Sequence, residues 1–300
     1  ISLRLALPRP RVFKPLLKMG QLFRPVLPGA LKRKVPKAGP APYWPAARHE
    51  RKMLVLDGCV QPGLAPNINA AAARVFDALK ISLVRAQGAG CCGALSYHLN
   101  AQAEGLDYMR QNIDAWSPHI EQGTQAVVMT ASGCGVMVKE YGHLLAHDLS
   151  YAGRAERVSA LTGDLSEILH AERDALKPAL ERAAKGRPAT KLAFHSPCTL
   201  QHGQQIRGFA EELLRLAGFE LTYVPDAHLC CGSAGTYSIL QPELSQQLLR
   251  NKVTALQSGG PQLIATANIG CLTHLESGTQ IPVKHWIEVL DERLASAAPA

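Results

Sequence analysis

The eight cysteines are the residues of this 300-residue chain best suited to chemistry, because they fall into two sets with the same spacing. The first set is Cys59, Cys91, Cys92 and Cys134, and the second set is Cys198, Cys230, Cys231 and Cys271. In each set 31 residues separate the first cysteine from the adjacent pair, and a glycine follows the pair. Four thiolates match a [4Fe-4S] cluster or a structural zinc ion.

Zinc, disulfides and ordinary buried thiols are the competing interpretations of this pattern. Structural zinc usually takes paired C-x2–4-C ligands and no such pair occurs here, so iron and sulfur are favoured while zinc stays open. Disulfides have little use in a leaderless chain of this size, and adjacent cysteines bond to each other only through a strained ring. Isolated thiols are often merely buried, but here all eight cysteines belong to the repeated pattern.

The residues around the cysteines also repeat, which indicates a duplicated domain. A shift of 139 residues places the segment from Lys52 to Cys59 on the segment from Lys191 to Cys198, and the first Cys-Cys-Gly sequence on the second. We therefore predict an arm at residues 1–51, a first cysteine-rich domain at residues 52–187 and a second at residues 188–300.

Within each predicted domain, short apolar runs bounded by glycine alternate with longer helical stretches, as in an α/β fold with buried parallel strands. In the first domain we expect strands at Met53–Leu56, Ile81–Val84 and Ala126–Thr130, and helices at Asn69–Leu79 and Ala101–Ala115. Each domain should close with a strand and a helix, at Val158–Leu161 with Leu165–Glu172 and at Ile281–Lys284 with Trp286–Leu294. The predicted fold class is α/β, with two repeated domains that each hold a mainly parallel sheet and flanking helices.

Each cysteine position follows one of these strands, directly or after a short loop. Ligands of open α/β sheets gather at the carboxyl ends of the strands. We therefore expect the four thiols of each set to converge on one edge of a sheet and to bind a metal centre. No catalytic residue is assigned to the chain.

The net charge of +8 is concentrated in the arm. Residues 1–51 carry twelve basic side chains and one acid, Glu50, whereas the other residues together carry about −3. Nine prolines and scattered apolar residues favour an extended segment over a nucleic-acid arm with stacking aromatics. This segment is either a solvated basic Pro-rich linker or a segment that docks on a neighbour or on anionic lipid. No apolar run reaches the roughly 20 residues that a transmembrane helix needs.

The order Cys, Cys-Cys-Gly and Gly-Cys occurs twice in residues 52–295 and resembles the cysteine-rich CCG domain. This domain is found in heterodisulfide reductase B subunits, in anaerobic glycerol-3-phosphate dehydrogenase C subunits and in the iron-sulfur subunits of lactate and glycolate oxidases. The segments from Phe23 to Pro36 and from Ser132 to Gly135 are most similar to the glycolate oxidase (glycolate dehydrogenase) iron-sulfur subunit family. That family carries two ferredoxin-type motifs ahead of this region. This chain has no C-x2-C-x2-C run, so we expect it to begin, at Ile1, inside a longer protein.

The resemblance implies an electron-transfer subunit of an oxidoreductase complex, rather than a chain that oxidises the substrate itself. A partner flavoprotein with FAD would oxidise glycolate to glyoxylate, and [4Fe-4S] clusters would pass the electrons to quinone or another acceptor. The implied location is the cytoplasm or the inner face of the bacterial cytoplasmic membrane. The alternatives are a catalytic subunit of the heterodisulfide reductase type, a subunit of a lactate or glycerol-3-phosphate dehydrogenase, and a metal-stabilised scaffold without a redox role.

The chain departs from the heterodisulfide reductase pattern at the fifth cysteine, three residues after the last cysteine of each set. Met137 and His274 stand at these two positions. His274 could ligate the metal or could be an ordinary hydrogen-bonded histidine, and Met137 is expected to pack. Four further histidines near the cysteine loops could bond to cluster sulfurs or relay protons: His98, His195, His202 and His228.

Overall fold

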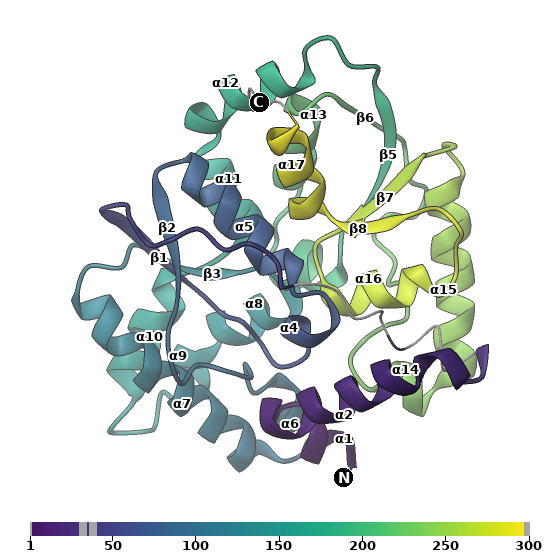
Figure 1. The fold of residues 1–300 in the computed structure, drawn as a ribbon. Helices are drawn as coiled ribbons and strands as arrows, with labels where there is room; N and C mark the ends of the chain where they lie inside the picture. The colour runs from purple at the N-terminus through teal and green to yellow at the C-terminus, as the bar shows by residue number, and fades with distance from the viewer. Residues whose placement is uncertain (1, 30–34, 36–40, 297–300) are drawn as a thin grey trace. The chain divides into compact units, whose positions relative to one another are not determined.

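The computed structural model describes residues 2–29, 35 and 41–296, which divide by their contacts into two units (Figure 1). The first unit holds the described residues up to Ala73, together with Lys80–Met129 and Met137–Gly163. The second unit holds Arg74–Leu79, Thr130–Val136 and the described residues from Asp164 onward.

The first unit is built on a four-stranded sheet with the strand order β2-β1-β3-β4. Its strands are β1 (Arg51–Val55), β2 (Ile81–Arg85), β3 (Val127–Met129) and β4 (Thr162–Asp164). β1 pairs in parallel with β2 on one side and β3 on the other, so that Leu54 lies opposite both Val84 and Val127. The inner residues of β1 and all of β3 are buried, as expected for strands covered on both faces.

Helices on both faces of this sheet complete the unit. They are α4 (Gln61–Leu64), α5 (Asn67–Ala78), α6 (Ala94–His98), α7 (Gln102–Glu121), α8 (Ser132–Lys139), α9 (Tyr141–Leu144) and α10 (Ala152–Leu161). The end of α5 after Ala73 and the start of α8 before Met137 are counted with the second unit. α10 packs against both α7 and α9. Crossovers between parallel strands are right-handed. The helix α5, which joins β1 to β2, therefore covers the face of the sheet opposite to the face covered by α7 and α10. The buried face of α7 carries Met109, Ile113 and Trp116 at helical spacing.

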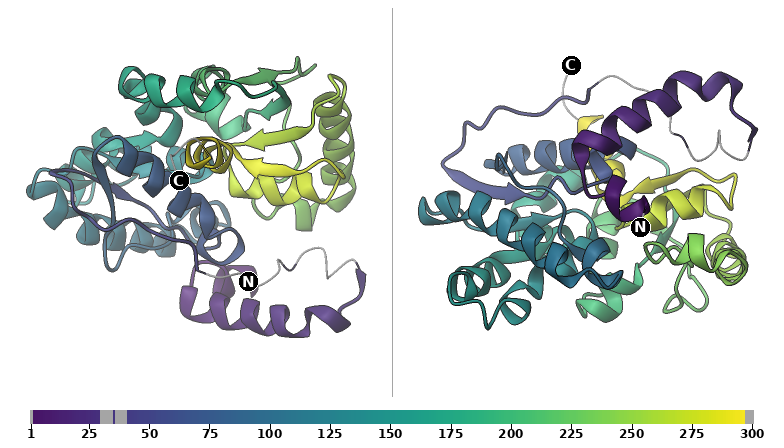
Figure 2. Two further views of the ribbon diagram at one scale, coloured as in Figure 1. Left: turned by 45° about the horizontal axis from the view of Figure 1, so that its top comes forward. Right: turned by 90° about the horizontal axis from the view of Figure 1, so that it is seen from below.

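The second unit repeats this plan with the strand order β6-β5-β7-β8. Its strands are β5 (Thr190–His195), β6 (Phe219–Leu221), β7 (Leu263–Thr266) and β8 (Val283–His285), and all its neighbouring pairs are parallel. Its helices are α11 (Leu165–Ala171), α12 (Arg173–Ala184), η2 (Thr199–Gly203), α13 (Phe209–Leu216), α14 (Tyr237–Leu240), α15 (Pro242–Gln257), α16 (Ile269–Glu276) and α17 (Trp286–Ala295). α12, α13 and α17 contact one another, and α15 contacts α16 (Figure 2). Two helix layers thus enclose the sheet.

The predicted α/β class with two parallel sheets and flanking helices is confirmed. The strands expected at Met53–Leu56, Ile81–Val84 and Ala126–Thr130 are β1, β2 and β3 with slightly shifted ends. The helices expected at Asn69–Leu79 and Ala101–Ala115 are α5 and α7, and α7 continues to Glu121. Local apolar patterns were therefore sufficient to find these elements.

The strand predicted at Val158–Leu161 was wrong, because these residues form the last turn of α10. Ala155 and Val158 are both buried and lie three residues apart, which is helical spacing, and the strand begins only at Thr162. The strand predicted at Ile281–Lys284 exists but is displaced toward the carboxyl end, as β8. Both closing helices, α11 and α17, are present.

The last residue of each closing strand caps the helix that follows it. Asp164 accepts a backbone N–H of α11, and His285 accepts a backbone N–H of α17. In both caps the glutamate three residues later, Glu167 or Glu288, accepts the backbone N–H of the capping residue. The duplication therefore extends to the capping box, although an imidazole replaces the carboxylate in the second copy.

The first part of the arm is helical up to Val26, so the prediction of an extended segment was wrong there, whereas the described residues 41–50 contain no helix. It contains α1 (Ser2–Ala6), α2 (Pro10–Phe23) and the 3₁₀ turn η1 (Arg24–Val26). Pro10 starts α2 at its first position, where a missing N–H costs nothing. Residues 30–34 and 36–40 of the predicted arm lie outside the described residues.

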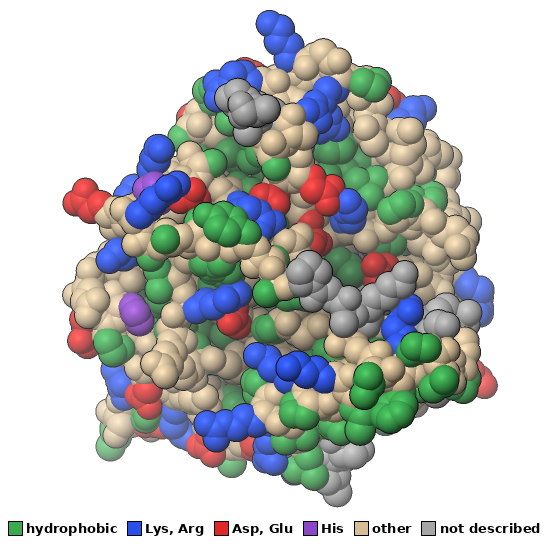
Figure 3. All heavy atoms as spheres, in the orientation of Figure 1, with side chains coloured by type: hydrophobic (Ala, Val, Ile, Leu, Met, Phe, Trp, Pro, Cys, Tyr) green, Lys and Arg blue, Asp and Glu red, His purple; other side chains and the backbone are tan. Residues whose placement is uncertain are grey.

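One side of α2 packs on its own unit and another side is exposed. Phe13 and Leu17 lie against Gly63 of α4, whereas Val12, Leu16 and Met19 are each more than two-fifths exposed. Hydrophobic side chains gather over α2 in the lower right of Figure 3. None of the helices in the described part of the chain has the length and apolar character needed to span a bilayer.

The contact division falls at Gly163, earlier than the predicted domain boundary between residues 187 and 188. Helices α11 and α12, which precede that boundary, pack with α13 and α17 of the second unit. The boundary at 187 and 188 stays a prediction about where the sequence repeat begins.

Candidate metal centre

The second cysteine set lies beyond the carboxyl ends of β5, β6 and β7, and all its members belong to the second unit. Cys198 follows β5, Cys230 and Cys231 follow the loop after β6, and Cys271 is the third residue of α16, after β7. None of the eight cysteines of the chain forms a disulfide. We refer to Cys198, Cys230, Cys231 and Cys271 as the second site.

Hydrogen bonds join the four thiols of the second site in a chain. Cys198 lies where it can donate to Cys230, and Cys231 lies where its one S–H can donate to either Cys230 or Cys271. These hydrogen bonds, reinforced by burial, raise the pKa of the two donor thiols. They lower the pKa of the two acceptors, Cys230 and Cys271. Since thiolate is the form that ligates metals, a bound cation would take the place of these shared protons.

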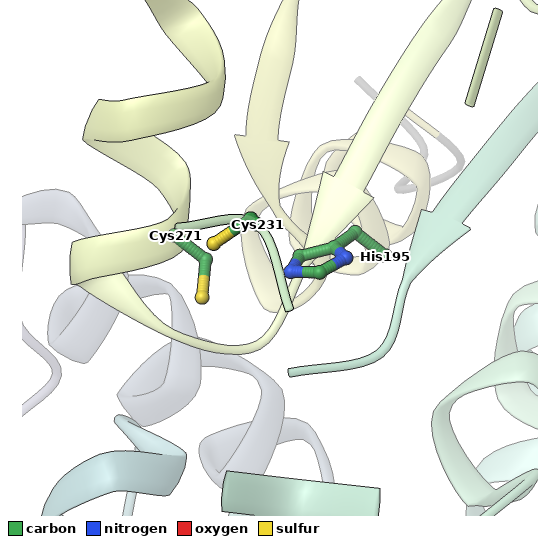
Figure 4. Close-up of side chains that lie close together, drawn as sticks. All are labelled: His195, Cys231 and Cys271. Carbon is green, nitrogen blue, oxygen red and sulfur yellow. The ribbon is translucent and has the colours of Figure 1, made fainter. Parts of the chain in front are cut away.

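His195, the last residue of β5, joins this group from the same sheet edge. A ring nitrogen of His195 and the Sγ atoms of Cys231 and Cys271 all lie within 4.8 Å of one another. Figure 4 shows the ring extending from the end of β5 toward the two sulfurs. In the part of the chain that the structure describes, no other His, Cys, Asp and Glu side chains form a group of three this compact.

The Cys-Cys-Gly loop of the second site depends on its glycine. Gly232 has a φ of +88°, and a Cβ there would lie 2.5 Å from the carbonyl oxygen of Ser245 in α15. The backbone N–H of Gly232 donates to Cys230 Sγ at 3.3 Å, and the Ser245 hydroxyl donates to the Gly232 carbonyl at 2.8 Å. The absence of a side chain at Gly232 therefore lets the loop pack directly against α15 while its backbone N–H donates to the Cys230 sulfur.

A buried cation lies close to the same loop. Lys252 of α15 is 2% exposed and donates from Nζ to the carbonyl oxygens of Asp226, at 2.7 Å, and Ala227, at 3.3 Å. Burial lowers the pKa of Lys252, and attraction to the thiols of the second site, Cys231 foremost, opposes this shift. A cavity of about 480 Å³ opens beside the loop, lined in part by Ser196, Asp226 and His228.

The first cysteine set shows the same kind of contacts among three of its members. Cys59 donates to Cys91, and this hydrogen bond together with burial raises the pKa of Cys59. Cys59 lowers the pKa of Cys91, but Cys92 and burial together outweigh this effect and raise the pKa to about 12. The Gly93 N–H donates to Cys91 Sγ at 3.5 Å, the equivalent of the Gly232 contact. We refer to this set as the first site.

Cys134, the fourth member of the first site, is the third residue of α8, just as Cys271 is the third residue of α16. By its contacts Cys134 is counted with the second unit, whereas Cys59, Cys91 and Cys92 are counted with the first. The convergence of Cys134 with the other three thiols stays a prediction.

The remaining candidates occupy other surroundings. His274 Nε2 lies 3.2 Å from the Ser245 hydroxyl and is not a member of the compact group, so its role as a ligand stays a prediction. Met137 is buried, as expected for a packing residue. His202 Nε2 bonds to the carbonyl of His228 at 2.9 Å, and His98 packs edge-on against Tyr97. Of the four further histidines, the structure places His195 against the thiols.

The second site fits a thiolate-bound metal group. Its donors are soft sulfurs and one imidazole, and the buried ring nitrogens of His195 have no hydrogen-bond partner among the described residues. Thiolate and imidazole are ligands for iron-sulfur clusters and for zinc. The arrangement can therefore hold a metal without any change in fold.

Comparisons with known proteins narrow this choice. The profile of the family "CCG: Cysteine-rich domain" matches residues 53–139 and 192–276. The chain is 52% identical over 297 residues to the glycolate oxidase iron-sulfur subunit of Escherichia coli, covering 98% of this chain and 70% of that protein. It is 28% identical over 257 residues to the probable glycolate oxidase iron-sulfur subunit of Bacillus subtilis, covering 85% and 56%. It is 26% identical over 241 residues to lactate utilization protein A of Bacillus licheniformis, covering 78% and 97%.

The matched segments contain every cysteine of both sets. These similarities confirm the family resemblance drawn from the cysteine spacing, and they support an iron-sulfur cluster over zinc. The chain belongs to the cysteine-rich CCG family and, within it, to the glycolate oxidase iron-sulfur subunits.

Proposed function

We propose that this chain relays electrons within a glycolate oxidase (glycolate dehydrogenase) complex. The observation that carries the proposal is the second site: four hydrogen-bonded thiols at the strand ends, in a chain 52% identical to a glycolate oxidase iron-sulfur subunit. Soft sulfur donors suit a redox centre better than a hydrolytic one.

Each site is proposed to hold one [4Fe-4S] cluster. The ligands would be Cys59, Cys91, Cys92 and Cys134 at the first site, and Cys198, Cys230, Cys231 and Cys271 at the second. Such a cluster, when bound, accepts and donates one electron at a time. The N–H donors of Gly93 and Gly232 support this assignment, because hydrogen bonds to ligand sulfurs stabilise negative charge on them.

Substrate oxidation is proposed to occur on a partner flavoprotein. Conversion of glycolate to glyoxylate releases two electrons and two protons, and FAD on the partner would take the hydride. This chain would then receive the two electrons singly and pass them to quinone or another acceptor, which takes up the protons. The cavity beside the second site gives an acceptor a place to approach.

The arm is proposed to hold the chain near its partners at the inner face of the cytoplasmic membrane. α2 presents exposed apolar residues next to the basic side chains of Arg11, Lys14 and Lys18. A helix with this composition suits an anionic lipid surface or an acidic partner surface. A location in the cytoplasm or on that membrane face is part of this proposal.

A single-turnover experiment on the assembled complex tests the relay. We expect Cys231→Ser to leave flavin bleaching by glycolate at its normal rate but to stop flavin reoxidation by quinone, because only the later step uses the second site. Gel filtration must show that the variant subunit stays in the complex. Cys92→Ser provides the matched variant at the first site.

Two outcomes would contradict this proposal. Quinone reduction at the wild-type rate by an intact complex carrying Cys231→Ser would make the second site structural. Turnover of glycolate by this chain alone, or reduction of a disulfide without any flavoprotein, would instead support a catalytic subunit of the heterodisulfide reductase type.

A further inference from the structure

His195 is the buried polar side chain whose situation the relay function leaves unexplained. It is 2% exposed, and neither Nδ1 nor Nε2 has a partner at hydrogen-bond geometry among the described residues, although the ring is close enough to the Cys271 thiol to lower the pKa of that thiol. Buried imidazoles almost always satisfy at least one nitrogen, because burying a polar group without a well-placed partner costs free energy. A metal bound between the ring and the sulfurs would be such a partner.

The surroundings of the ring identify the chemistry of that partner. The donor atoms of His195, Cys231 and Cys271 lie within 4.8 Å of one another. Around a tetrahedral metal atom, imidazole nitrogen and thiolate sulfur ligands stand roughly 3.3–3.8 Å apart, given bonds of about 2.0–2.3 Å. Small side-chain movements would bring the imidazole nitrogen within bonding distance of a metal atom held by one of the two sulfurs. Since each iron of a [4Fe-4S] cluster already carries one cysteine, the imidazole would be an additional ligand on the iron of Cys231 or Cys271.

We propose that His195 is a metal ligand at the second site, beside Cys231 and Cys271. This inference rests on the proposed function in taking the bound group to be an iron-sulfur cluster. The imidazole would enter as a neutral ligand through the nitrogen that faces the sulfurs in Figure 4.

The first site lacks this ligand, so the two sites are chemically different. The shift of 139 residues that aligns the two cysteine sets places Leu56 at the position of His195. Leu56 is 3% exposed and can only pack. The second site would keep its four thiolates and gain a neutral donor, whereas the first site has thiolates alone. The two clusters should therefore differ in reduction potential, because ligand identity sets the potential of a cluster.

His274 is the competing histidine. It stands where related proteins have a fifth cysteine, but its Nε2 lies 3.2 Å from the Ser245 hydroxyl, which in turn donates to Gly232. His195 instead lies at the strand end against the sulfurs. A direct comparison of the two histidines is therefore the decisive test.

The experiment uses the full chain, purified anaerobically with ¹⁵N-labelled histidine and reduced, in wild-type form and as His195→Leu, His195→Cys and His274→Leu. Pulsed electron paramagnetic resonance reports the magnetic coupling between a cluster and a ligating nitrogen. We expect this coupling in wild-type protein and in His274→Leu, and its loss in both His195 variants. In redox titrations His195→Cys should lower the potential of one cluster and leave the other unchanged.

Folding controls keep these outcomes interpretable. His195→Leu copies the residue of the first site, and His195→Cys retains a metal-binding side chain, so at least one should keep its iron and its elution volume. Loss of the nitrogen coupling in His274→Leu, or its persistence in His195→Cys, would overturn the inference while leaving the electron relay intact.

Metal analysis separates failure of the inference from failure of the proposed function. Iron at both sites with no histidine coupling in wild-type protein would overturn only the role of His195. Zinc at the second site would overturn the relay function of that site. In that case, imidazole scattering in the zinc X-ray absorption spectrum that disappears in His195→Leu would still support His195 as a ligand.

Discussion

At the scale of single residues, the glycine after each cysteine pair is the position most tightly constrained. Gly93 and Gly232 have nearly equal φ values, +87° and +88°. An added Cβ would meet a helix carbonyl in both places, that of Gly105 at 2.6 Å and that of Ser245 at 2.5 Å. Glycine is required at each position because the backbone is left-handed and passes close to a helix carbonyl. This close packing fixes the position of the cysteine that precedes the glycine.

We expect Gly232→Ala to destabilise the folded protein by about 3 kcal/mol, from left-handed strain plus the clash with Ser245. Gly208→Ala is the matched control, because Gly208 has a φ of +83° with open space around the added Cβ. The control should cost only about 1 kcal/mol. Urea unfolding monitored by circular dichroism measures both, and equal effects would show that the contact with α15 is unimportant.

The sequence identified the cysteines but could not single out His195. Four histidines lie within a few residues of a cysteine loop, and sequence distance treats them alike. His195 differs because it ends β5, so its side chain shares the sheet edge with the thiols. The repeat alignment did contain a signal, because it pairs His195 with Leu56 and so shows a histidine where the other copy has an apolar residue. The alignment alone does not show that the histidine side chain points toward the thiols.

At the scale of elements, the helix caps after β4 and β8 give a pH dependence. His285 accepts the Ile287 N–H through Nδ1, and its Nε2–H donates to the Thr130 carbonyl at 2.9 Å. The ring is therefore held neutral, and burial lowers its pKa to about 4. Protonation would remove the acceptor that caps α17.

The free energy of unfolding should fall as the pH drops. Below the ordinary histidine pKa the unfolded chain binds a proton that the folded chain rejects, so stability decreases from about pH 6.5 down to the folded pKa of about 4. Between about pH 7.5 and pH 5.5 the loss from His285 is about 1.4 kcal/mol. His285→Asn keeps a capping acceptor but does not titrate. In this variant the free energy of unfolding, measured with urea at both pH values, should therefore drop by about 1.4 kcal/mol less than in the wild type. An equal drop in the variant and in the wild type would show that His285 does not cap α17 as a neutral ring.

The arm shows why composition misled the prediction of its structure. Nine prolines suggested an extended chain, but Pro10 lies at the first position of α2, where proline is tolerated. Between the prolines, Phe13 and Leu17 recur at helical spacing and pack on α4. Leu16 and Met19 of the same helix stay exposed.

Replacing Leu16 and Met19 by Ser should weaken binding of the chain to its partner complex or to anionic lipid vesicles, because these residues form the exposed apolar side of α2. We expect a several-fold loss, larger at high salt, where the basic residues contribute less. Leu149→Ser is the control, since Leu149 is fully exposed outside the arm. Co-sedimentation measures binding, and equal behaviour of the two variants would leave α2 without a docking role.

At the scale of the whole molecule, a shift of 139 residues predicted a duplication that the strand orders repeat, β2-β1-β3-β4 and β6-β5-β7-β8. The same shift could not predict the division of contacts. Thr130–Val136, which include Cys134, are counted with the second unit although they belong to the first repeat. Contacts between segments distant in sequence leave no local pattern, whereas strands, helices and cysteine spacing do.

The duplication leads to a prediction about metal content. Anaerobically purified protein should be brown and bind about four iron atoms at each site. Cys92→Ser and Cys231→Ser should each remove about half of the iron, because each changes one repeat and leaves the donors of the other in place. Since a cluster binds only the folded chain, its removal should also lower the midpoint of thermal unfolding. Iron, sulfide and zinc analysis alongside thermal unfolding measures both effects. Colourless protein with stoichiometric zinc after anaerobic reconstitution would show that these thiols build a structural site, and an unchanged unfolding midpoint after metal removal would show that the metal does not stabilise the fold.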